Sequence, residues 1–497
     1  MKRFLTCVGL VSFLTAGALF AAESPKELVR VDGLSLAQVR AIGMKGYDVA
    51  KAGRDYVEVV VTPQELKSLP ITKTTPKVLI PDMDAYIAGV LSKQVRGAAY
   101  FTYDTMTAAL KDMAQKYPNI ARLSSIGKSI EGREIWAVKV SNNPDKDQKI
   151  PAALIMGAHH SREWISDEVP MEALKQMLAG YGKDETLTRL VNTRETWFVP
   201  MVNPDGITYS QTKSKYWRKN RRKVDANNYG VDPNRNYGWH WGNVGASSDP
   251  SQDTYHGTGP FSEPETSAIK ALAEREHFQA SISFHSYSEL VLYPFGYGND
   301  IPCSDTATLS KLAGEMASFN HYTPENSATL YPAMGDSDDW LYGSCKTLAF
   351  TIELATEFIP SPDKIAGITA LNVPAVFHLI DKAGTYGLTT PTGDASLASH
   401  VDAKTALAAI SDGTALSASL SEDSRIETGD RIQAIGRHLA ELTAAEMAQG
   451  NSETWEQIKN TPAASFVKSL VRDCLTFSAV HGDKVDPALL NEVSSTR

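Results

Sequence analysis

A histidine and a carboxylate with the spacing of metal ligands lie in residues 157–164. His160 and Glu163 are three residues apart and follow an apolar run, residues 152–156. We expect the segment to open a helix, on which side chains three apart face the same way and can bind one ion. Zinc accepts imidazole nitrogen and carboxylate oxygen, and catalytic zinc sites use three protein ligands. The pair therefore indicates part of a metal site, although an isolated pair is also common at a solvated junction between strand and helix.

Two further residues have the types that such a site needs. His285 ends an apolar run, residues 280–284, and so belongs at the C-terminal edge of a sheet, where α/β folds assemble their sites. Glu353 ends another apolar run and is costly to bury unless it has a partner or lines a cleft. These positions suit a third ligand and a general base, but a structural histidine and an exposed strand-end glutamate have the same pattern.

Residues 213–223 form a basic island in an acidic chain. The island is compatible with a nucleic-acid patch, a solvated loop, or a cleft wall that offers a guanidinium to an oxyanion. Residues 232–236 follow and contain Arg235, whose planar guanidinium suits two-point binding of a carboxylate.

Six short motifs carry a family resemblance. They are HSREW at 160–164, NPDG at 203–206, WRK at 217–219, DPNRN at 232–236, SFHSY at 283–287 and FTIEL at 350–354. In this order and at these separations, the motifs resemble those of the zinc carboxypeptidases typified by the pancreatic A and B enzymes. The resemblance covers roughly residues 100–386, and several ordered motifs make chance agreement improbable.

The resemblance implies one catalytic zinc ion bound by His160, Glu163 and His285. His159 is four residues before Glu163, so helix spacing does not choose between the two histidines; the family pattern selects His160. Asp232 matches the carboxylate that orients a ligand histidine.

The resemblance also implies the catalytic and substrate-binding positions. Glu353 matches the general base, and Arg218 matches the residue that polarises the scissile carbonyl. The substrate-binding positions are matched by Arg162, Asn234, Arg235, Tyr331 and Asp338. Asn234 and Arg235 correspond to a clamp for the terminal carboxylate, which explains exopeptidase action because a mid-chain bond would leave the guanidinium buried and unpaired.

Asp338 lies where the family places the floor of the side-chain pocket. Relatives that prefer Lys or Arg carry Asp at this position, so the pocket pattern is nearest to that of carboxypeptidase B. A buried carboxylate there would bind a cationic side chain and disfavour an apolar one. Asp beside Gly and Ser is also common in solvated turns, which is the alternative for residues 335–340.

The elements around these residues predict an α/β three-layer sandwich with a mixed central sheet, preceded by a small α+β unit. Strands are expected at 56–61, 135–140, 152–156, 196–202, 280–284 and 348–354, and helices at 103–113, 164–178, 269–274 and 373–380. We expect a signal peptide at 1–22, a pro-segment and linker at 23–96, the catalytic domain at 97–388, and a partly helical extension at 389–497. Residues 69–81 lack periodicity and are expected to be a linker.

Composition and charge narrow the class of protein. The net charge of −9 over 497 residues disfavours a nucleic-acid or anionic-membrane partner. A basic start, an apolar stretch and small residues at 21–22 predict export, to the periplasm or the medium, with no membrane attachment afterwards. Removal of Cys7 leaves three cysteines, of which Cys303 and Cys345 could pair.

The sequence therefore predicts a monomeric, exported zinc metallocarboxypeptidase that acts on peptide and protein C-termini. It also predicts a zymogen that an activating protease cuts. A cell-wall peptidase that trims peptidoglycan stems is the alternative enzyme, since it would use the same site. A catalytically dead binding domain is the non-enzyme alternative, and it is disfavoured because every catalytic position is filled.

Overall fold

The structure is a computed structural model that describes residues 25–71, 74–92, 99–298, 301, 303–329 and 331–386. The expected signal peptide and C-terminal extension lie outside the described residues, as do Cys7 and Cys474. Cys303 and Cys345 are both free thiols, so the pairing considered for them is not formed. No helix in the described ranges is long and apolar enough to cross a membrane.

The N-terminal unit is a four-stranded sheet with two helices. Its elements are β1 (Glu27–Asp32), α1 (Leu36–Met44), β2 (Asp48–Ala52), β3 (Tyr56–Val61), α2 (Pro63–Leu66) and β4 (Lys77–Ile80), with strand order β2-β3-β1-β4. Both helices begin with a capping box, in which Ser35 or Thr62 exchanges hydrogen bonds with the residue three positions on. The linker expected at 69–81 is partly wrong, because β4 pairs antiparallel with β1. With four residues, mostly exposed, β4 is too short to give a clear periodic signal in the sequence.

The second unit is built on an eight-stranded mixed sheet, as predicted. The strands are β5 (Ala121–Lys128), β6 (Glu134–Val140), β7 (Ala152–Met156), β8 (Glu195–Val199), β9 (Ala280–Ser286), β10 (Leu290–Tyr293), β11 (Thr323–Asn326) and β12 (Leu348–Leu354), in the order β11-β10-β12-β9-β7-β8-β6-β5. The four central strands β12, β9, β7 and β8 run parallel. Strands β7, β8 and β9 are buried along their whole length, which is why they read as continuous apolar runs.

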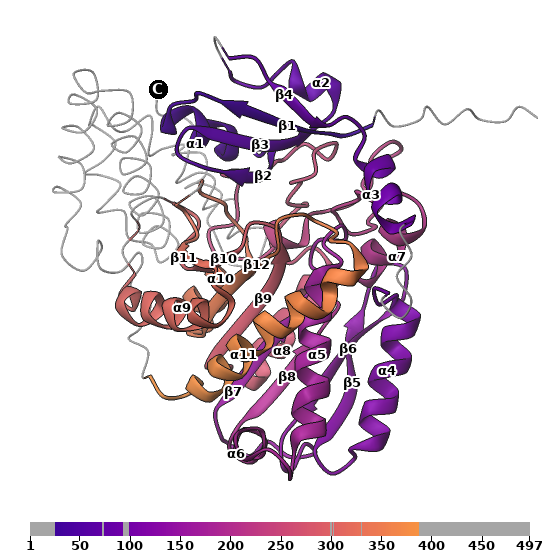
Figure 1. Cartoon of the computed structure of the whole chain (residues 1–497), viewed down its shortest axis with the longest axis vertical. Helices are drawn as coiled ribbons and strands as arrows, with labels where there is room; N and C mark the ends of the chain where they lie inside the picture. Colours follow the sequence, from indigo (N-terminus) through magenta and orange to yellow (C-terminus); the bar gives the residue numbers. More distant parts are fainter. Residues whose placement is uncertain are drawn as a thin grey trace, which may run out of the picture.

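Helices cover both faces of this sheet and complete the three layers. They are α4 (Tyr103–Lys116), α5 (Ile165–Gly180), α6 (Glu185–Thr193), α7 (Pro204–Thr212), α8 (Pro264–Glu276), α9 (Thr306–Asn320), α10 (Ser337–Gly343) and α11 (Ile365–Lys382). Helices α4, α5 and α11 lie in front of the sheet in Figure 1, and α8 lies behind it. The three-layer α/β prediction is therefore confirmed.

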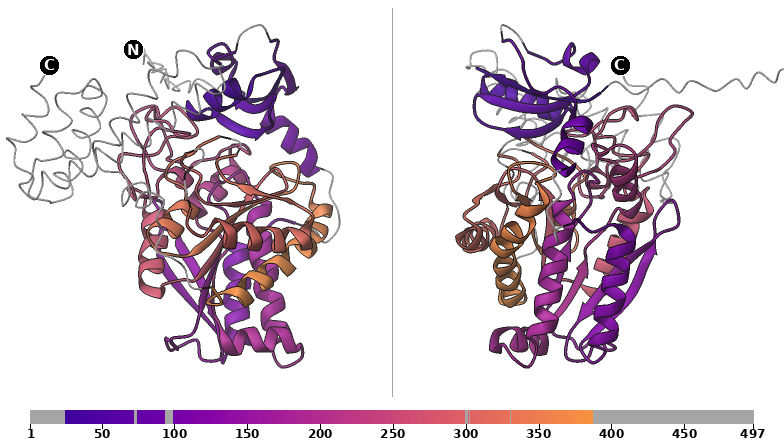
Figure 2. Two further views of the ribbon diagram at one scale, coloured as in Figure 1. Left: turned by 90° about the vertical axis from the view of Figure 1, so that its left-hand side faces the viewer. Right: turned by 45° about the vertical axis from the view of Figure 1, so that its right-hand side comes forward.

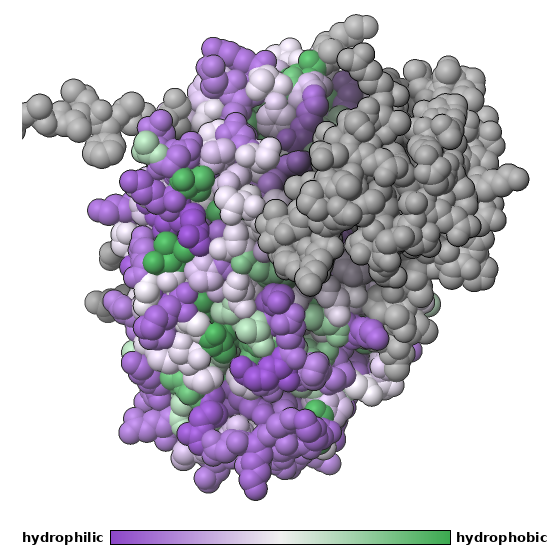
Figure 3. Space-filling model, turned by 180° about the vertical axis from the view of Figure 1, so that it is seen from behind, coloured by the Kyte–Doolittle hydropathy of each residue, from purple (hydrophilic) through white to green (hydrophobic). Residues whose placement is uncertain are grey.

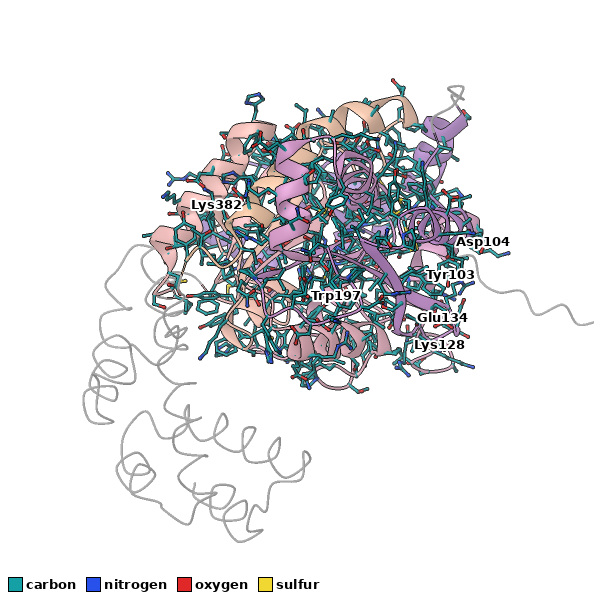
Figure 4. All side chains as sticks on the ribbon, turned by 90° about the horizontal axis from the view of Figure 1, so that it is seen from below. Tyr103, Asp104, Lys128, Glu134, Trp197 and Lys382 are labelled. Atoms are coloured by element: carbon teal, nitrogen blue, oxygen red, sulfur yellow. The ribbon has the colours of Figure 1, made fainter. Side chains whose placement is uncertain are left out.

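The N-terminal unit lies over one end of the large sheet, where the parallel strands finish (Figures 1 and 2). Helix α3 (Met83–Ser92) runs down one side from this unit. At the opposite end, seen from below in Figure 4, Lys128 and Glu134 form a surface ion pair with Nζ 2.5 Å from Oε1. Hydrophilic residues also predominate on the rear of that end (Figure 3).

Gly157, directly after β7, packs too closely for any side chain. A Cβ there would lie 2.3 Å from the carbonyl oxygen of Ser166 and 2.9 Å from that of Pro200. We predict that Gly157→Ala lowers the free energy of unfolding by about 1–3 kcal/mol, because backbone on two sides must move. Gly89→Ala is the control, since a Cβ at Gly89 meets nothing within 4 Å. Equal denaturant midpoints for the two variants would contradict this account.

Candidate metal centre

His160 and Glu163 lie in a tight turn between β7 and α5. The amide of Glu163 donates to the carbonyl oxygen of His160 at 3.2 Å, and α5 begins only at Ile165. The expectation that the pair lies on the helix is therefore wrong by two residues. The turn nevertheless places the two side chains next to each other, as a helical turn would, because its hydrogen bond joins residues three apart.

His160, Glu163 and His285 form one buried group. The two Nδ1 atoms of the histidines are 3.1 Å apart, and the Glu163 carboxylate oxygens lie 2.8 Å from His160 Nδ1 and 3.0 Å from His285 Nδ1. One ligand atom from each residue lies within 4.8 Å of the others. Two imidazole nitrogens and one carboxylate oxygen are a donor set that zinc uses in catalytic sites. The three residues therefore fit a zinc ion.

Burial and charge act against each other on the Glu163 carboxyl group. Burial raises its pKa, but the positive charge and hydrogen bonds of His160 and His285 outweigh this and hold the pKa well below its usual range. A carboxylate that stays ionised in a buried site needs a cation beside it. A bound metal ion would meet that need without protonated histidines.

Asp232 links the metal group to Arg218. Its Oδ1 lies 3.0 Å from His160 Nε2 and accepts a hydrogen bond from the amide of Asn234 at 2.9 Å. Its Oδ2 accepts from Arg218 Nε at 2.9 Å. Burial raises the Asp232 pKa, but Arg218 and His160 lower it further, and the result is well below the usual value. The carboxylate therefore orients a histidine and an arginine at once.

His159 is not a member of this group, because both of its ring nitrogens face other partners. Its Nε2 lies 2.8 Å from the Tyr237 hydroxyl and its Nδ1 lies 3.2 Å from Ser283 Oγ. The choice of His160 over His159, which the family pattern made, is thus the one that agrees with the geometry.

Glu353 lies beside His285 across the sheet. The two residues are partners in the parallel register of β12 and β9, so their side chains share one face. Burial raises the pKa of Glu353 to about 8, Glu163 raises it too, and His285 and Arg218 oppose the shift. In the metal-free chain the carboxyl group therefore holds its proton at neutral pH, and a cation bound beside it would lower its pKa.

One cavity of about 110 Å³ collects nearly all the positions named from the sequence. Its lining includes His160, Arg162, Glu163, Arg218, Asn234, Arg235, Tyr331, Asp338 and Glu353. Arg235 donates to the carbonyl oxygens of Gly245 and Asn234, both at 2.7 Å, and within the described ranges it forms no ion pair with a carboxylate. Its guanidinium is thus held in place by neutral groups and keeps its charge for an anion.

Asp338 is a buried residue in the lining of this cavity. Its carboxylate accepts hydrogen bonds from the hydroxyls of Thr351 at 3.2 Å and Ser327 at 3.3 Å. Only 4% of its surface is exposed, so the solvated-turn alternative does not hold. Burial raises its pKa above the usual value.

The N-terminal unit closes the cavity through β2. Asp48 makes two bonds to Arg162, at 2.5 and 2.6 Å, and its Oδ1 lies 3.7 Å from Arg218. Tyr331 packs against Gly43 of α1, and its hydroxyl lies 3.5 Å from the carbonyl oxygen of Val49. Arg162 is thus fully buried and paired with a carboxylate of the N-terminal unit.

The basic island is largely absorbed by internal contacts. Arg222 pairs with Glu263 at 2.8 Å, and Lys219 donates to two backbone carbonyl oxygens. The Arg221 guanidinium lies over the rings of Tyr209, 3.6 Å from its centroid, and Trp217. Because its cations are engaged in this way, the cleft-wall interpretation is favoured over a nucleic-acid patch.

Sequence reasoning missed three residues that bear on the site. Asp48 and Lys26, whose ammonium pairs with Asp253, come from the N-terminal unit and give no signal before its docking is known. Ser283 contacts His285 Nε2 at 3.0 Å. Its position two residues before His285 on a strand, and hence on the same face, could have identified it.

A buried His–Glu–His group at the carboxyl edge of a mixed α/β sheet defines a metal-dependent hydrolase type of centre. Residues 106–373 match the family described as zinc carboxypeptidase. A zinc carboxypeptidase of Saccharothrix mutabilis subsp. capreolus is 32% identical over 74% of this chain and 92% of its own length. Human carboxypeptidase B is 31% identical over 56% of this chain and 69% of its own length.

The fold agrees with these sequence matches. The crystal structure of thrombin activatable fibrinolysis inhibitor has a TM-score of 0.61 and 26% identity, and the match covers 73% of this chain and all of that one. The chain belongs to the zinc carboxypeptidase family, and it is a zinc metallopeptidase.

Proposed function

We propose that this chain is a metallocarboxypeptidase that hydrolyses the C-terminal peptide bond of peptides and proteins. The observation that carries the proposal is that one small cavity holds two of the three metal-binding residues, a half-buried glutamate, and an arginine that pairs with no carboxylate in the part of the chain that the structure describes. Arg235 would bind the terminal carboxylate of the substrate and so select the last peptide bond. An internal peptide bond offers no carboxylate at this point and would bury an unpaired guanidinium.

His160, Glu163 and His285 would hold the zinc ion, which in such sites acidifies water and polarises a carbonyl group. Glu353 would take the proton of the attacking water and pass it to the leaving amine. Arg218, which is fixed by Asp232, would stabilise the negative charge that develops on the carbonyl oxygen.

We predict that loss of the base and loss of the metal can be separated. Glu353→Gln should retain zinc but lower kcat by about 100- to 10,000-fold, because an amide cannot accept the proton. Ala at His160, Glu163 or His285 should remove zinc and activity together, because only two protein ligands remain. Zinc content and hydrolysis of a short peptide are measured on each purified variant.

Glu357→Gln is the matched control, since it neutralises a glutamate that pairs with Lys364 and does not line the cavity. It should leave both zinc and turnover unchanged. Near-normal turnover by zinc-loaded Glu353→Gln would show that another group is the base.

We also propose that residues 23–96 are a removable inhibitory pro-segment on an exported protein, for which residues 1–22 are the signal. Asp48 occupies Arg162, and Val49, Ala50 and Lys51 line the cavity that the substrate must enter. A peptide C-terminus therefore competes with β2 for the same space. An activating protease could cut the segment between Ser92 and Ala99, because this segment contains Lys93 and Arg96.

We predict that cleavage between Ser92 and Ala99 increases kcat/KM for short peptides. In the intact chain, Asp48→Asn should give part of this increase, because it weakens the hold of β2 on Arg162. Asp55→Asn, on the exposed surface of the same unit, is the control. An intact chain as active as the cleaved one would rule out inhibition by residues 23–96.

We further propose that Asp338 favours substrates ending in Lys or Arg. It lines the same cavity as Arg235, so a side chain beside a clamped carboxylate could reach it. Thr351 and Ser327 satisfy part of its hydrogen bonding, and an ammonium or guanidinium group would supply the missing charge. Gly296 lines the same cavity and has no side chain to fill it, which leaves space for a long substrate side chain.

We predict that peptides ending in Lys or Arg are cleaved about 10- to 100-fold better than matched peptides ending in Phe or Leu, the equivalent of one hydrogen bond to a charged group. Asp338→Ala and the isosteric Asp338→Asn should both remove this advantage and keep zinc. Because burial raises the Asp338 pKa, its proton returns at a higher pH than usual, so the advantage should fall as the pH is lowered.

Equal or better cleavage of Phe-ended peptides by the unmodified chain would overturn the specificity proposal. Peptidoglycan stem peptides are included in the same panel. Their preferential cleavage would favour the cell-wall peptidase instead.

A further inference from the structure

The two metal-binding histidines turn the same nitrogen, Nε2, outward to different partners. Both direct Nδ1 toward Glu163, at 2.8 Å from His160 and 3.0 Å from His285. The outer nitrogen of His160 meets the carboxylate of Asp232, but that of His285 meets the hydroxyl of Ser283 at 3.0 Å. A hydroxyl group can donate or accept, so by itself it does not decide where the proton of His285 lies.

Behind Ser283 lies a buried chain of two more groups. Ser283 Oγ is 3.2 Å from His159 Nδ1, and His159 Nε2 is 2.8 Å from the hydroxyl of Tyr237. All three side chains are at most 2% exposed. The rings of His159 and His285 also stack, with centroids 5.5 Å apart and planes 18° apart. The metal-binding histidine is thus connected to Tyr237, two residues after Arg235.

A metal ion held by His285 would impose one direction on this chain of hydrogen bonds, because the nitrogen that faces Glu163 is Nδ1. That nitrogen must then be free of hydrogen, so Nε2 carries the proton and donates to Ser283. The hydroxyl of Ser283 must donate elsewhere, and in the described part of the chain its other hydrogen-bond partner is His159 Nδ1. His159 therefore carries its own proton on Nε2, facing Tyr237.

We propose that His159 is a positioning residue that keeps His285 in the tautomer able to bind the metal. With an apolar residue at 159, the Ser283 proton would turn toward His285 Nε2 and move the imidazole proton to Nδ1, where the ion must bind. The inference rests on the proposed zinc site, and it assigns a role to a histidine that contacts neither metal nor substrate.

The test is zinc affinity of the full-length protein, measured by competition with a chelator after metal removal. His159→Leu should raise the zinc dissociation constant by about 10- to 100-fold, the usual effect of losing a partner behind a metal ligand. His159→Asn should bind within about 3-fold of the unmodified chain, because Asn Oδ1 stands where Nδ1 stood and can accept from Ser283. Thermal unfolding of each apo protein checks that the variants are folded.

A double-mutant cycle separates positioning from packing. Ser283→Ala should weaken zinc binding by itself, and adding His159→Leu to it should have little further effect, because the residue acts through Ser283. Should His159→Leu not fold, Ser283→Ala and His159→Asn still give opposite expected results. In the zinc-loaded protein, the nitrogen NMR signals of His285 should show hydrogen on Nε2.

Unchanged zinc affinity in His159→Leu, or an equal loss in the presence and absence of the Ser283 hydroxyl, would overturn the proposal. Peptidase activity of the unmodified chain is measured on the same samples. Normal peptidase activity with zinc affinity independent of His159 would reject this role alone. Zinc affinity that depends on His159 without peptidase activity would reject the proposed function alone, and absence of zinc binding by the unmodified chain would reject both.

Discussion

The Asp232 carboxylate is the constraint on which the site depends. It is fully buried, and each of its oxygens is engaged, one with His160 and the other with Arg218. Burying an ionised carboxylate is affordable only when charge and hydrogen bonds surround it. Here those partners are themselves the groups that need orientation, so one buried charge sets the positions of His160, proposed to bind the metal, and Arg218, proposed to stabilise the oxyanion. The 3-10 turn at Pro233–Arg235 then follows directly and carries Arg235 to the same cavity.

The parallel arrangement of the central strands explains why residues far apart in the chain meet. Strands β7, β9 and β12 run in one direction, so the segments that follow or end them share an edge. His160 follows β7, His285 ends β9, and Glu353 lies opposite His285 in register. A shift of one residue in β12 would turn the glutamate to the other face of the sheet. The buried apolar residues of these strands therefore fix the register, and with it the positions of these side chains as well as the fold.

The central strands, their helices and the metal group could be predicted from the sequence, because buried strands give continuous apolar runs and the motifs follow in a known order. Other features could not. Strand β4 is short and exposed, so local pattern does not distinguish it from a linker. The pairing of Asp48 with Arg162 joins residues 114 positions apart, and no local pattern reports such docking. His159 and His160 lie four and three residues before Glu163, and both spacings are compatible with a helix. Only the three-dimensional structure of the turn shows which of the two rings faces Glu163.

The contact between the two units contains two ion pairs of opposite direction. The N-terminal unit presents a carboxylate, Asp48, to Arg162 and an ammonium, Lys26, to Asp253. Arg162 and Asp253 already lie 4.0 Å apart. Departure of the unit would therefore withdraw one negative and one positive charge together and leave the two remaining groups as a ready-made ion pair. The catalytic unit would change partners without changing its net charge, and the arginine would stay neutralised on one side while its other side opened to the cleft.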